Sequence, residues 1–314
     1  MKVSKSLANE VLKNLRKIGI VDNSLKPKVE GDYVLIPIKK SIDAYELVYE
    51  DFEPRKRNLS LKECISRKLG EGNWPRSFNQ IGDIAVISLK DNINDQLKEV
   101  IVECLMSNSK VKAVWGKVET SGEERVAKLV HLGGERITET IYKENGLSFK
   151  VDISKVYVNP SLATEHYLVS ELVRDGERVL DLFAGIGFFS FNIAKRKECK
   201  CLAVDMNPYA IKYAIESLFM NKLKGNVSFL LSKAEDLLEV TARKQFDVTI
   251  MNLPHKSHEY VDRVVEVTRR LVIAYSVGSR EEVIGRFRRH EIINLRKVLD
   301  YAPYKYIWRV ELKP

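Results

Sequence analysis

Residues 178–190, Arg-Val-Leu-Asp-Leu-Phe-Ala-Gly-Ile-Gly-Phe-Phe-Ser, decide the fold of this chain. A short apolar run ends in an acid, passes through a Gly-x-Gly turn and continues into a helical pattern. Gly185 and Gly187 let the backbone approach a ligand closely, and open α/β sheets bind ligands at the carboxyl ends of their strands. The stretch therefore predicts the first strand, the ligand-binding turn and the next helix of a doubly wound α/β domain.

The sequence around this turn alternates strand-like and helical stretches, which is the βαβ rhythm of a parallel sheet. The strand-like runs lie at 179–182, 201–205, 227–231 and 248–251. Two further runs, 292–299 and 304–312, are joined by only four residues, so they must pair antiparallel. We therefore expect an α/β, class I (Rossmann-like) methyltransferase domain over 151–314, with a C-terminal antiparallel hairpin.

The N-terminal part predicts the first of two small α+β domains. Leu7 and Leu15 belong to an apolar series at helical spacing, and a β-rich run follows at 32–38. This pattern predicts a small α/β module over 1–55. The next stretch, 56–79, is strongly charged and punctuated by Gly and Pro, which is typical of a linker.

A second α+β domain is expected over 80–150. A strand-like run at 81–89 precedes an amphipathic helical pattern at 93–105, and another strand-like run follows at 111–118. The domain closes with Asn145-Gly146 between two alternating runs, which is a strong signal for a β-hairpin.

Composition limits the classes of protein to consider. A chain of 314 residues that is 45% hydrophobic and 30% charged is typical of a soluble protein with two or three domains. No apolar run approaches the roughly 18 residues that a membrane span requires. The first residues lack the continuous apolar region of a secretory signal, so we expect a cytoplasmic protein.

Charge and cysteine content point to a polyanionic partner and to reduced thiols. The formal net charge of +9 favours a partner such as RNA, because neutralised phosphates release their counterions. The cysteines are too few and too scattered for a disulfide framework, and neither they nor the histidines form a metal-binding pattern. We expect no metal and four buried or incidental thiols: Cys64, Cys104, Cys199 and Cys201.

Two acids flank the glycine turn at positions that suit S-adenosyl-L-methionine. Asp181 ends the first strand, where it suits the cationic amino group of the methionine part. Asp205 ends the second strand, where an acid can accept both ribose hydroxyls, although it could instead be a helix N-cap. Met206 would pack on the adenine face, and adenine recognition would rest on Glu235 or on backbone groups. The predicted cofactor-binding set is Asp181, Phe183, Ala184, Gly185, Gly187, Asp205, Met206, Asn207, Glu235 and Asn252.

The fourth strand runs into Met-Asn-Leu-Pro at 251–254. Methyltransferases that act on amino or ring nitrogens carry an Asn/Asp-Pro-Pro-like turn at this point, and it positions the acceptor nitrogen in line with the sulfonium methyl group. Asn252 and Pro254 are therefore candidate catalytic residues. An ordinary strand-to-helix turn is the alternative.

With its Asn-Leu-Pro turn, the chain resembles the archaeal and eukaryotic tRNA guanine-N1 methyltransferases that act on the purine 3′ to the anticodon, position 37. The resemblance covers nearly the whole chain. It rests on the segments 140–146, 151–160, 163–165, 181–187 and 252–254, followed by His258-Glu259. It implies S-adenosyl-L-methionine as cofactor and N1-methylguanosine as product.

The resemblance also implies three residues around the target base: Arg125, Tyr157 and Glu165. Guanine N1 is a poor nucleophile until its proton leaves, so Glu165 would act as general base and Arg125 would stabilise the charge that develops on O6. Without the resemblance, Glu165 would be read as a carboxylate at a helix N-terminus and Arg125 as an exposed loop charge. The family usually has arginine at positions 161 and 166 and an acid at 233, whereas this chain has Ser161, His166 and Lys233.

These departures concern the choice of substrate, and several functions stay open beside the preferred one. Relatives in the wyosine pathway methylate C7 of a tricyclic guanine derivative, or transfer an aminocarboxypropyl group, at the same nucleotide. A catalytically silent tRNA-binding protein and a methyltransferase for protein or small molecules are further alternatives. By resemblance, the N-terminal module would contact the outer corner of the tRNA, the other domains would hold the anticodon stem-loop, and the protein would act as a monomer.

Overall fold

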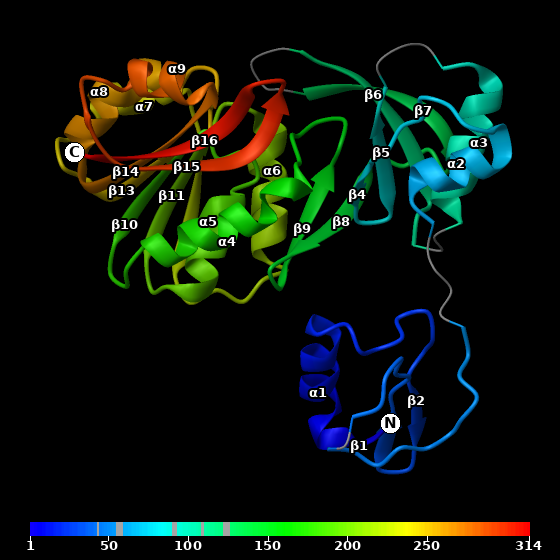
Figure 1. Ribbon diagram of the computed structural model, residues 1–314. Helices are drawn as coiled ribbons and strands as arrows, with labels where there is room; N and C mark the ends of the chain where they lie inside the picture. The colour runs from blue at the N-terminus through cyan, green and yellow to red at the C-terminus, as the bar shows by residue number, and fades with distance from the viewer. Residues whose placement is uncertain (43, 55–58, 90–92, 108–109, 122–125) are drawn as a thin grey trace. The chain divides into compact units, whose positions relative to one another are not determined.

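The computed structural model describes residues 1–42, 44–54, 59–89, 93–107, 110–121 and 126–314 (Figure 1). Contacts divide the chain into two units, Met1–Ser60 (unit 1) and Leu61–Pro314 (unit 2). Among the described residues, no helix combines the length and the apolar character that a membrane crossing requires.

Unit 1 is a three-stranded antiparallel sheet with one helix. Its elements are β1 (Lys2–Ser4), α1 (Lys5–Lys17), β2 (Lys28–Glu30) and β3 (Tyr33–Leu35). The strands lie in the order β1-β3-β2. Leu15 of α1 is buried in one core with Met1, Val3 and Ile36, because the apolar positions of the helix recur on one face. The helix predicted around Leu7 and Leu15 is thus confirmed.

The first part of unit 2 is a four-stranded sheet with two helices. Its elements are α2 (Leu61–Leu69), β4 (Asn79–Ile81), β5 (Ile84–Ser88), α3 (Asp95–Met106), β6 (Ala113–Ser121) and β7 (Val126–Gly134). The order is β4-β5-β6-β7, with β5 and β6 parallel. Helix α2 lies inside the stretch 56–79, so the prediction of a linker is wrong there. The charged residues of α2 belong to an amphipathic helix whose Leu61 and Ile65 share a core with Ile101 of α3.

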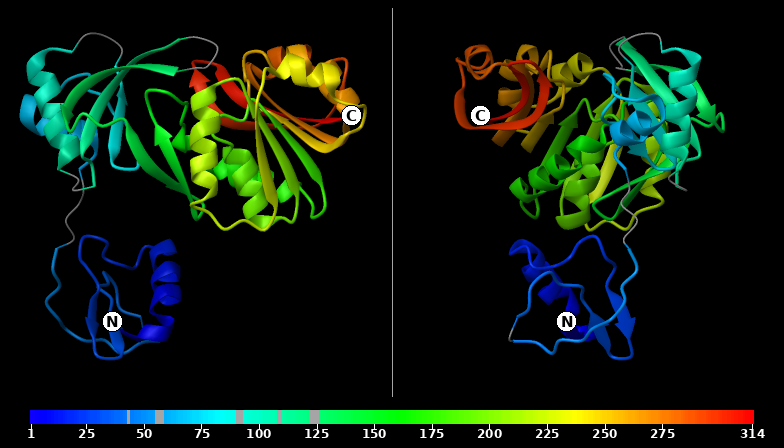
Figure 2. Two further views of the ribbon diagram at one scale, coloured as in Figure 1. Left: turned by 180° about the vertical axis from the view of Figure 1, so that it is seen from behind. Right: turned by 45° about the vertical axis from the view of Figure 1, so that its right-hand side comes forward.

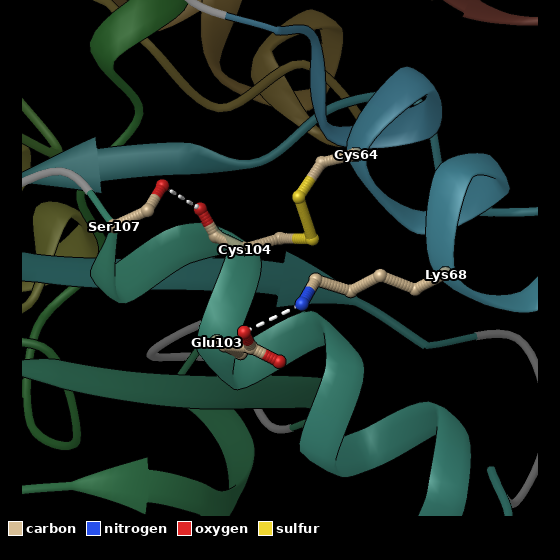
Figure 3. Close-up of a disulfide and its surroundings, with 5 residues drawn as sticks. All are labelled: Cys64, Lys68, Glu103, Cys104 and Ser107. Carbon is tan, nitrogen blue, oxygen red and sulfur yellow. Dashed lines mark hydrogen bonds and ion pairs between the residues drawn. A yellow bond between two sulfur atoms is a disulfide. The ribbon is translucent and has the colours of Figure 1, made fainter.

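A disulfide joins α2 to α3 through Cys64 and Cys104, whose Cα atoms lie 5.9 Å apart (Figure 3). The prediction of four thiols is therefore wrong for this pair. The two cysteines are 40 residues apart in sequence and become neighbours only because the helices pack together, which spacing alone does not reveal. Cys199 and Cys201 are free and buried, as expected. Figure 3 also shows the ion pair of Lys68 and Glu103, which links the same two helices.

A β-hairpin of β8 (Glu139–Glu144) and β9 (Leu147–Asp152) follows, as the sequence predicts. Asn145 and Gly146 both have positive φ, 50° and 75°, the backbone conformation that a tight hairpin turn requires. Phe149 of β9 is fully buried against Phe188 and Phe191 of the methyltransferase domain. The hairpin thereby packs directly against the helix that follows the glycine turn.

The C-terminal part of unit 2 contains a seven-stranded sheet. Its strands are β10 (Arg178–Leu182), β11 (Lys200–Asp205), β12 (Asn226–Leu231), β13 (Phe246–Met251), β14 (Thr268–Gly278), β15 (Glu291–Ala302) and β16 (Lys305–Lys313). The order is β12-β11-β10-β13-β14-β16-β15, and β16 runs antiparallel to both its neighbours. The expected class I methyltransferase fold is confirmed, including the C-terminal hairpin.

Helices cover both faces of this sheet (Figures 1 and 2). They are the short 3₁₀ turn η1 (Pro160–Leu162), α4 (Ala163–Leu172), α5 (Phe188–Arg196), α6 (Pro208–Leu218), α7 (Ala234–Val240), α8 (Ser257–Val267) and α9 (Arg280–Arg286). One core joins α4 and α5 to alternate strand residues such as Val179 and Val248, and the other joins α7, α8 and α9 to Leu180 and Val272. Because both faces are buried, the carboxyl ends of the parallel strands are where a ligand can reach the sheet.

Candidate active site

A cavity of about 840 Å³ opens at the carboxyl ends of β10, β11 and β13. Nine of the residues that the sequence assigns to the site line it: Tyr157, Phe183, Ala184, Gly185, Asp205, Met206, Asn207, Glu235 and Asn252. Asp181, Gly187, Pro254 and Glu165 lie outside the lining, and Arg125 lies outside the described residues. The cavity also includes residues for which the sequence analysis gives no role, among them Asn159, His255 and Lys256.

The glycine turn is held against the tip of β11 by Asp205. One carboxylate oxygen, Oδ2, accepts a hydrogen bond from the Gly185 backbone N–H at 2.7 Å, and Oδ1 accepts one from the Asn207 N–H at 2.9 Å. Gly185 and Gly187 have φ of 56° and 85°, which few side-chain-bearing residues tolerate. At Gly187 a Cβ would also lie 3.1 Å from the Phe229 ring. Both glycines are therefore required by the backbone path of the turn.

Asn207, not Asp205, is the N-cap of α6. Its Oδ1 accepts a hydrogen bond from the Tyr209 N–H at 2.9 Å, and its side-chain amide donates to the Lys155 carbonyl at 2.9 Å. This excludes the alternative that Asp205 is a plain helix cap. Asn207 lines the cavity, but these two bonds occupy its side chain.

Asp181 lies beneath the turn, fully buried. Its Oδ2 accepts hydrogen bonds from the backbone N–H and hydroxyl of Ser190, at 3.2 and 2.8 Å. Its Oδ1 has no hydrogen-bond partner in the described part of the chain. Burial raises the pKa of Asp181 to about 7, and the nearby Asp205 charge adds to the rise. An unpaired buried carboxylate oxygen at this point fits a cationic group such as the ammonium of a methionine moiety.

The wall around the predicted adenine position mixes apolar and polar groups. Met206 is 38% exposed and faces the cavity. Phe183, which has an uncommon positive φ of 70°, packs edge-to-face on Tyr260 with the ring centroids 5.0 Å apart. Glu235 accepts a short hydrogen bond from the Tyr260 hydroxyl, and this bond is the main cause of the lowered pKa of Glu235. Lys233 also lines the cavity, so the wall carries charges of both signs.

The Asn-Leu-Pro turn forms another side of the cavity. Asn252 and Leu253 line it, whereas Pro254 is buried behind them. The Pro254 carbonyl accepts a hydrogen bond from the Val277 N–H at 3.0 Å, and the Ser257 hydroxyl donates to the Tyr275 carbonyl. These bonds fix the turn to β14, so Asn252 sits on a rigid support at the edge of the cavity.

Glu165 does not line the cavity. Its carboxylate accepts hydrogen bonds from the Tyr275 hydroxyl at 2.9 Å and from Arg309 Nη1 at 2.8 Å, and the residue is 3% exposed. Burial and the Glu165 charge raise the pKa of Tyr275 well above its ordinary value. Tyr157 lines the cavity, and its hydroxyl accepts a hydrogen bond from the Asn159 amide at 3.2 Å.

His166, the next residue along α4, does line the cavity. Its Nδ1 lies 2.8 Å from Glu144 Oε1 at the end of β8, and both side chains are almost fully buried. In the sequence, His166 stands out only as a departure from the family pattern, and Glu144 has no predicted role. Glu144 directly precedes the predicted Asn145-Gly146 turn, which gives its place in the hairpin. Nothing in the sequence shows that this turn meets α4.

Comparisons with known proteins agree with this geometry. The TRM5/TYW2 methyltransferase domain matches residues 140–298, a TYW2 N-terminal domain matches 61–138, and a tRNA methyltransferase 5 N-terminal domain matches 1–46. The chain belongs to the TRM5/TYW2 methyltransferase family. The glycine turn, Asp205 and the Asn-Leu-Pro turn all lie within the matched methyltransferase domain, and residues of all three line the cavity.

Three relatives illustrate the similarity. A Pyrococcus abyssi protein named tRNA (guanine(37)-N(1))-methyltransferase Trm5b is 35% identical, over 94% of this chain and 93% of its own length. A Nanoarchaeum equitans protein named tRNA (guanine(37)-N(1))/4-demethylwyosine(37)-methyltransferase Taw22 is 37% identical, over 72% of this chain and 73% of its own. The structure of aTrm5 in its complex with tRNALeu is 29% identical with a TM-score of 0.73, covering 99% of this chain and 98% of that one.

Within this TRM5/TYW2 family member, the described residues contain no group of three or more His, Cys, Asp or Glu side chains that could hold a metal ion. The roles predicted for individual site residues stay predictions. The geometry adds their grouping. The cofactor candidates gather around the Gly185 turn, Tyr157 and Asn252 line the same cavity, and Glu165, bonded to Arg309, is not among the lining residues.

Proposed function

We propose that this chain is an S-adenosyl-L-methionine-dependent tRNA methyltransferase that forms N1-methylguanosine at position 37. The observation that carries the proposal is a single cavity lined by both Asp205, beside the glycine turn, and Asn252, of the Asn-Leu-Pro turn. Relatives named for this reaction match the chain over nearly its whole length, which supports the same assignment.

The cofactor would lie across the carboxyl ends of β10 and β11. Asp205 would accept the ribose hydroxyls, Met206 would cover one face of the adenine, and Glu235 or nearby backbone groups would meet its edge. The unpaired Oδ1 of Asp181 would form an ion pair with the methionine ammonium. When bound, the cofactor supplies an electrophilic methyl group on a sulfonium and leaves as the neutral thioether.

The chain's own residues would position the guanine, and the Glu165 carboxylate would accept its N1 proton, the role that the family resemblance implies. Asn252, fixed by the Asn-Leu-Pro turn, would orient the base edge so that N1 faces the methyl group, since alignment of the reacting atoms supplies much of the acceleration in such reactions. Tyr157, which lines the same cavity, would also contact the base. Arg125, predicted to stabilise O6, lies outside the described residues.

The partner would be tRNA. The net charge of +9 suits a phosphate backbone, and Lys233 and Lys256 line the cavity itself. The match of residues 1–46 to a tRNA methyltransferase 5 N-terminal domain supports a role for unit 1 in tRNA contact. Binding at the outer corner and the anticodon stem-loop, monomeric action and a cytoplasmic location remain predictions.

A second candidate function is methylation of C7 in 4-demethylwyosine at the same nucleotide. The similarity to Taw22, whose name includes both reactions, favours it. Aminocarboxypropyl transfer is less well supported: this chain carries the Asn-Leu-Pro turn and a segment matching a tRNA methyltransferase 5 N-terminal domain, both of which those enzymes generally lack.

The test uses two substrates, a tRNA transcript with G37 and a tRNA that carries 4-demethylwyosine at position 37. Each is incubated with the full-length protein and S-adenosyl-L-methionine, and its nucleosides are separated by chromatography and identified by mass spectrometry. N1-methylguanosine from the first substrate supports the primary proposal. A methylated product from the second substrate alone supports the alternative, and an aminocarboxypropyl adduct without methylguanosine contradicts both.

A further inference from the structure

The turn between β15 and β16 lies on the edge of the sheet where the cavity opens. Strand β16 runs antiparallel to β14, and its Tyr306 is paired with Gly278, the last residue of β14. Because β14 is parallel to β13, both strands end at the edge that also carries the carboxyl ends of β10 and β11. Residues 301–305 therefore continue past the end of β14, on the same edge as the cavity.

Tyr301 joins this turn to the cavity wall. Its ring packs edge-to-face on the ring of His255 with the centroids 5.6 Å apart, and its hydroxyl lies 3.4 Å from His255 Nε2. His255 lines the cavity. Tyr301 is nevertheless 53% exposed, so much of its surface is available to a molecule that reaches the cavity from solvent.

Tyr304 occupies a position that normally favours glycine. Ala302 pairs with Lys305, so Pro303 and Tyr304 are the central residues of a two-residue turn. Tyr304 has a φ of 61°, in the left-handed region that turns usually fill with Gly or Asn. A bulky side chain is strained there, and 87% of Tyr304 is exposed, so packing does little to offset the strain. A strained aromatic residue that faces solvent on this edge indicates a binding role.

The base of the hairpin is firmly attached to the sheet. Tyr306 packs edge-to-face on Trp308 with the ring centroids 6.0 Å apart, and Trp308 Nε1 donates a hydrogen bond to the Gly278 carbonyl at 3.0 Å. Strand β16 is also paired with both β14 and β15 along its length. The exposed rings at the turn therefore stand on a rigid support.

Positive charge accompanies the exposed rings. Lys297 Nζ lies 3.8 Å from the centroid of the Tyr306 ring and pairs with Asp300 at 2.6 Å. Lys305 is exposed at the end of the turn, and Lys256 lines the cavity. A surface that combines aromatic rings with lysines suits single-stranded nucleic acid, because bases stack on the rings and cations attract the phosphates.

We propose that Tyr301 and Tyr304 form a stacking surface for the unpaired RNA bases that flank the target nucleotide. The inference rests on the proposed function, in which a single nucleotide enters the cavity. A nucleotide that leaves its stack deprives the neighbouring bases of a stacking partner, and an aromatic side chain that replaces the partner stabilises the opened loop. Both tyrosines are positioning residues: they hold the flanking bases at the edge of the cavity and thereby align the target base.

The test compares variants of the full-length protein that keep the ring with variants that remove it. Tyr301→Phe and Tyr304→Phe keep it, whereas Tyr301→Ala and Tyr304→Gly remove it. Phe219→Ala is the matched control, because Phe219 is 85% exposed but lies at the far end of α6, whose first turn is beside the cavity. The dissociation constant for G37 tRNA is measured by filter binding, and 2-aminopurine at each nucleotide that flanks position 37 reports stacking by its fluorescence.

We expect Tyr301→Ala and Tyr304→Gly each to weaken tRNA binding about tenfold, the usual effect of losing one base–ring stack, and to raise the fluorescence of 2-aminopurine at one flanking nucleotide. Both phenylalanine variants and Phe219→Ala should bind within threefold of wild type. An abasic site at the same nucleotide should weaken binding by a similar factor, and the two losses should not multiply. Tyr304→Gly should melt at or above the wild-type temperature, because glycine adopts positive φ without strain, which separates lost stacking from a folding defect.

Unchanged affinity and fluorescence in both variants without the ring would overturn the inference while leaving the proposed function intact. Equal losses in the phenylalanine variants would also overturn it, because those variants keep the stacking ring. Losses that multiply between a tyrosine variant and the abasic tRNA would show that the ring and the base do not contact each other. Absence of N1-methylguanosine with the wild-type protein is a different result, because it contradicts the proposed function itself.

Discussion

Replacement of Asp181 by asparagine should change how the stability of unit 2 depends on pH. Burial raises the pKa of Asp181 to about 7 from 3.8. Below pH 3.8 the carboxyl is neutral in the folded and unfolded states, and the raised pKa costs nothing. As pH rises, the unfolded chain ionises first, so stability is lost progressively until the folded carboxyl ionises near pH 7. In full, the loss amounts to about 4 kcal/mol, because each pKa unit corresponds to about 1.4 kcal/mol.

The difference between variant and wild type isolates this effect. The asparagine amide of Asp181→Asn does not titrate, and the other ionisable groups are common to both proteins. Between about pH 5 and pH 8, the unfolding free energy of Asp181→Asn should rise relative to wild type by about 3 kcal/mol. Chemical denaturation followed by tryptophan fluorescence suits the measurement, because all three tryptophans, Trp74, Trp115 and Trp308, lie in unit 2.

A second arm of the experiment tests the predicted contact with the methionine ammonium. A cation near the unpaired Oδ1 favours the ionised carboxyl, so saturating S-adenosylhomocysteine, which keeps this ammonium, should flatten the pH dependence of wild type. A free-energy difference between the two proteins that stays constant over the same pH range would show that the pKa of Asp181 is not raised by folding. If the ligand stabilised both proteins equally at every pH, the predicted contact between Asp181 and the cofactor would be wrong.

Three further changes test other parts of the structure. Asp205→Asn should weaken S-adenosyl-L-methionine binding about 10²-fold by calorimetry, because Asp205 accepts the Gly185 N–H and is predicted to accept the ribose hydroxyls. A change below threefold would contradict that predicted role. Asn252→Ala should lower the single-turnover rate at least about 10²-fold with the cofactor dissociation constant nearly unchanged, and an equal loss in binding would argue against a role in aligning the base. Cys104→Ala should lower the unfolding free energy of unit 2 by about 4 kcal/mol, because the disulfide closes a loop of 40 residues. Wild-type protein whose disulfide has been reduced should be as stable as the variant. Equal stability of the oxidised and reduced wild-type protein would show that the cross-link is not stabilising.

The parallel sheet and its cofactor turn were predictable because local patterns determine them. The apolar runs of β10 and β11 are short and bounded, and the acids at their ends fall on the same edge by the geometry of parallel strands. The Asn145-Gly146 turn was equally clear, since few other residue pairs adopt positive φ at both positions.

Contacts between distant segments were not predictable in this way. The pairing of Cys64 with Cys104 depends on how two amphipathic helices pack, and the sequence shows only that each has an apolar face. The Glu144–His166 pair likewise needs the β8–β9 hairpin to meet α4. The bond between Glu165 and Arg309 was unpredictable for a related reason, because Arg309 lies 144 residues away on β16.

We propose that the cavity directs a methyl group to N1 of the guanine at position 37. The most direct measurement is nuclease mapping of a G37 tRNA transcript after reaction with the protein and S-adenosyl-L-methionine, with each fragment analysed by mass spectrometry. We predict one methyl group, on the fragment that contains nucleotide 37, released as N1-methylguanosine and absent when G37 is replaced by A. A methyl group on another fragment, a methylated guanosine other than the N1 isomer, or no methylation under conditions where the cofactor binds would contradict the proposed function.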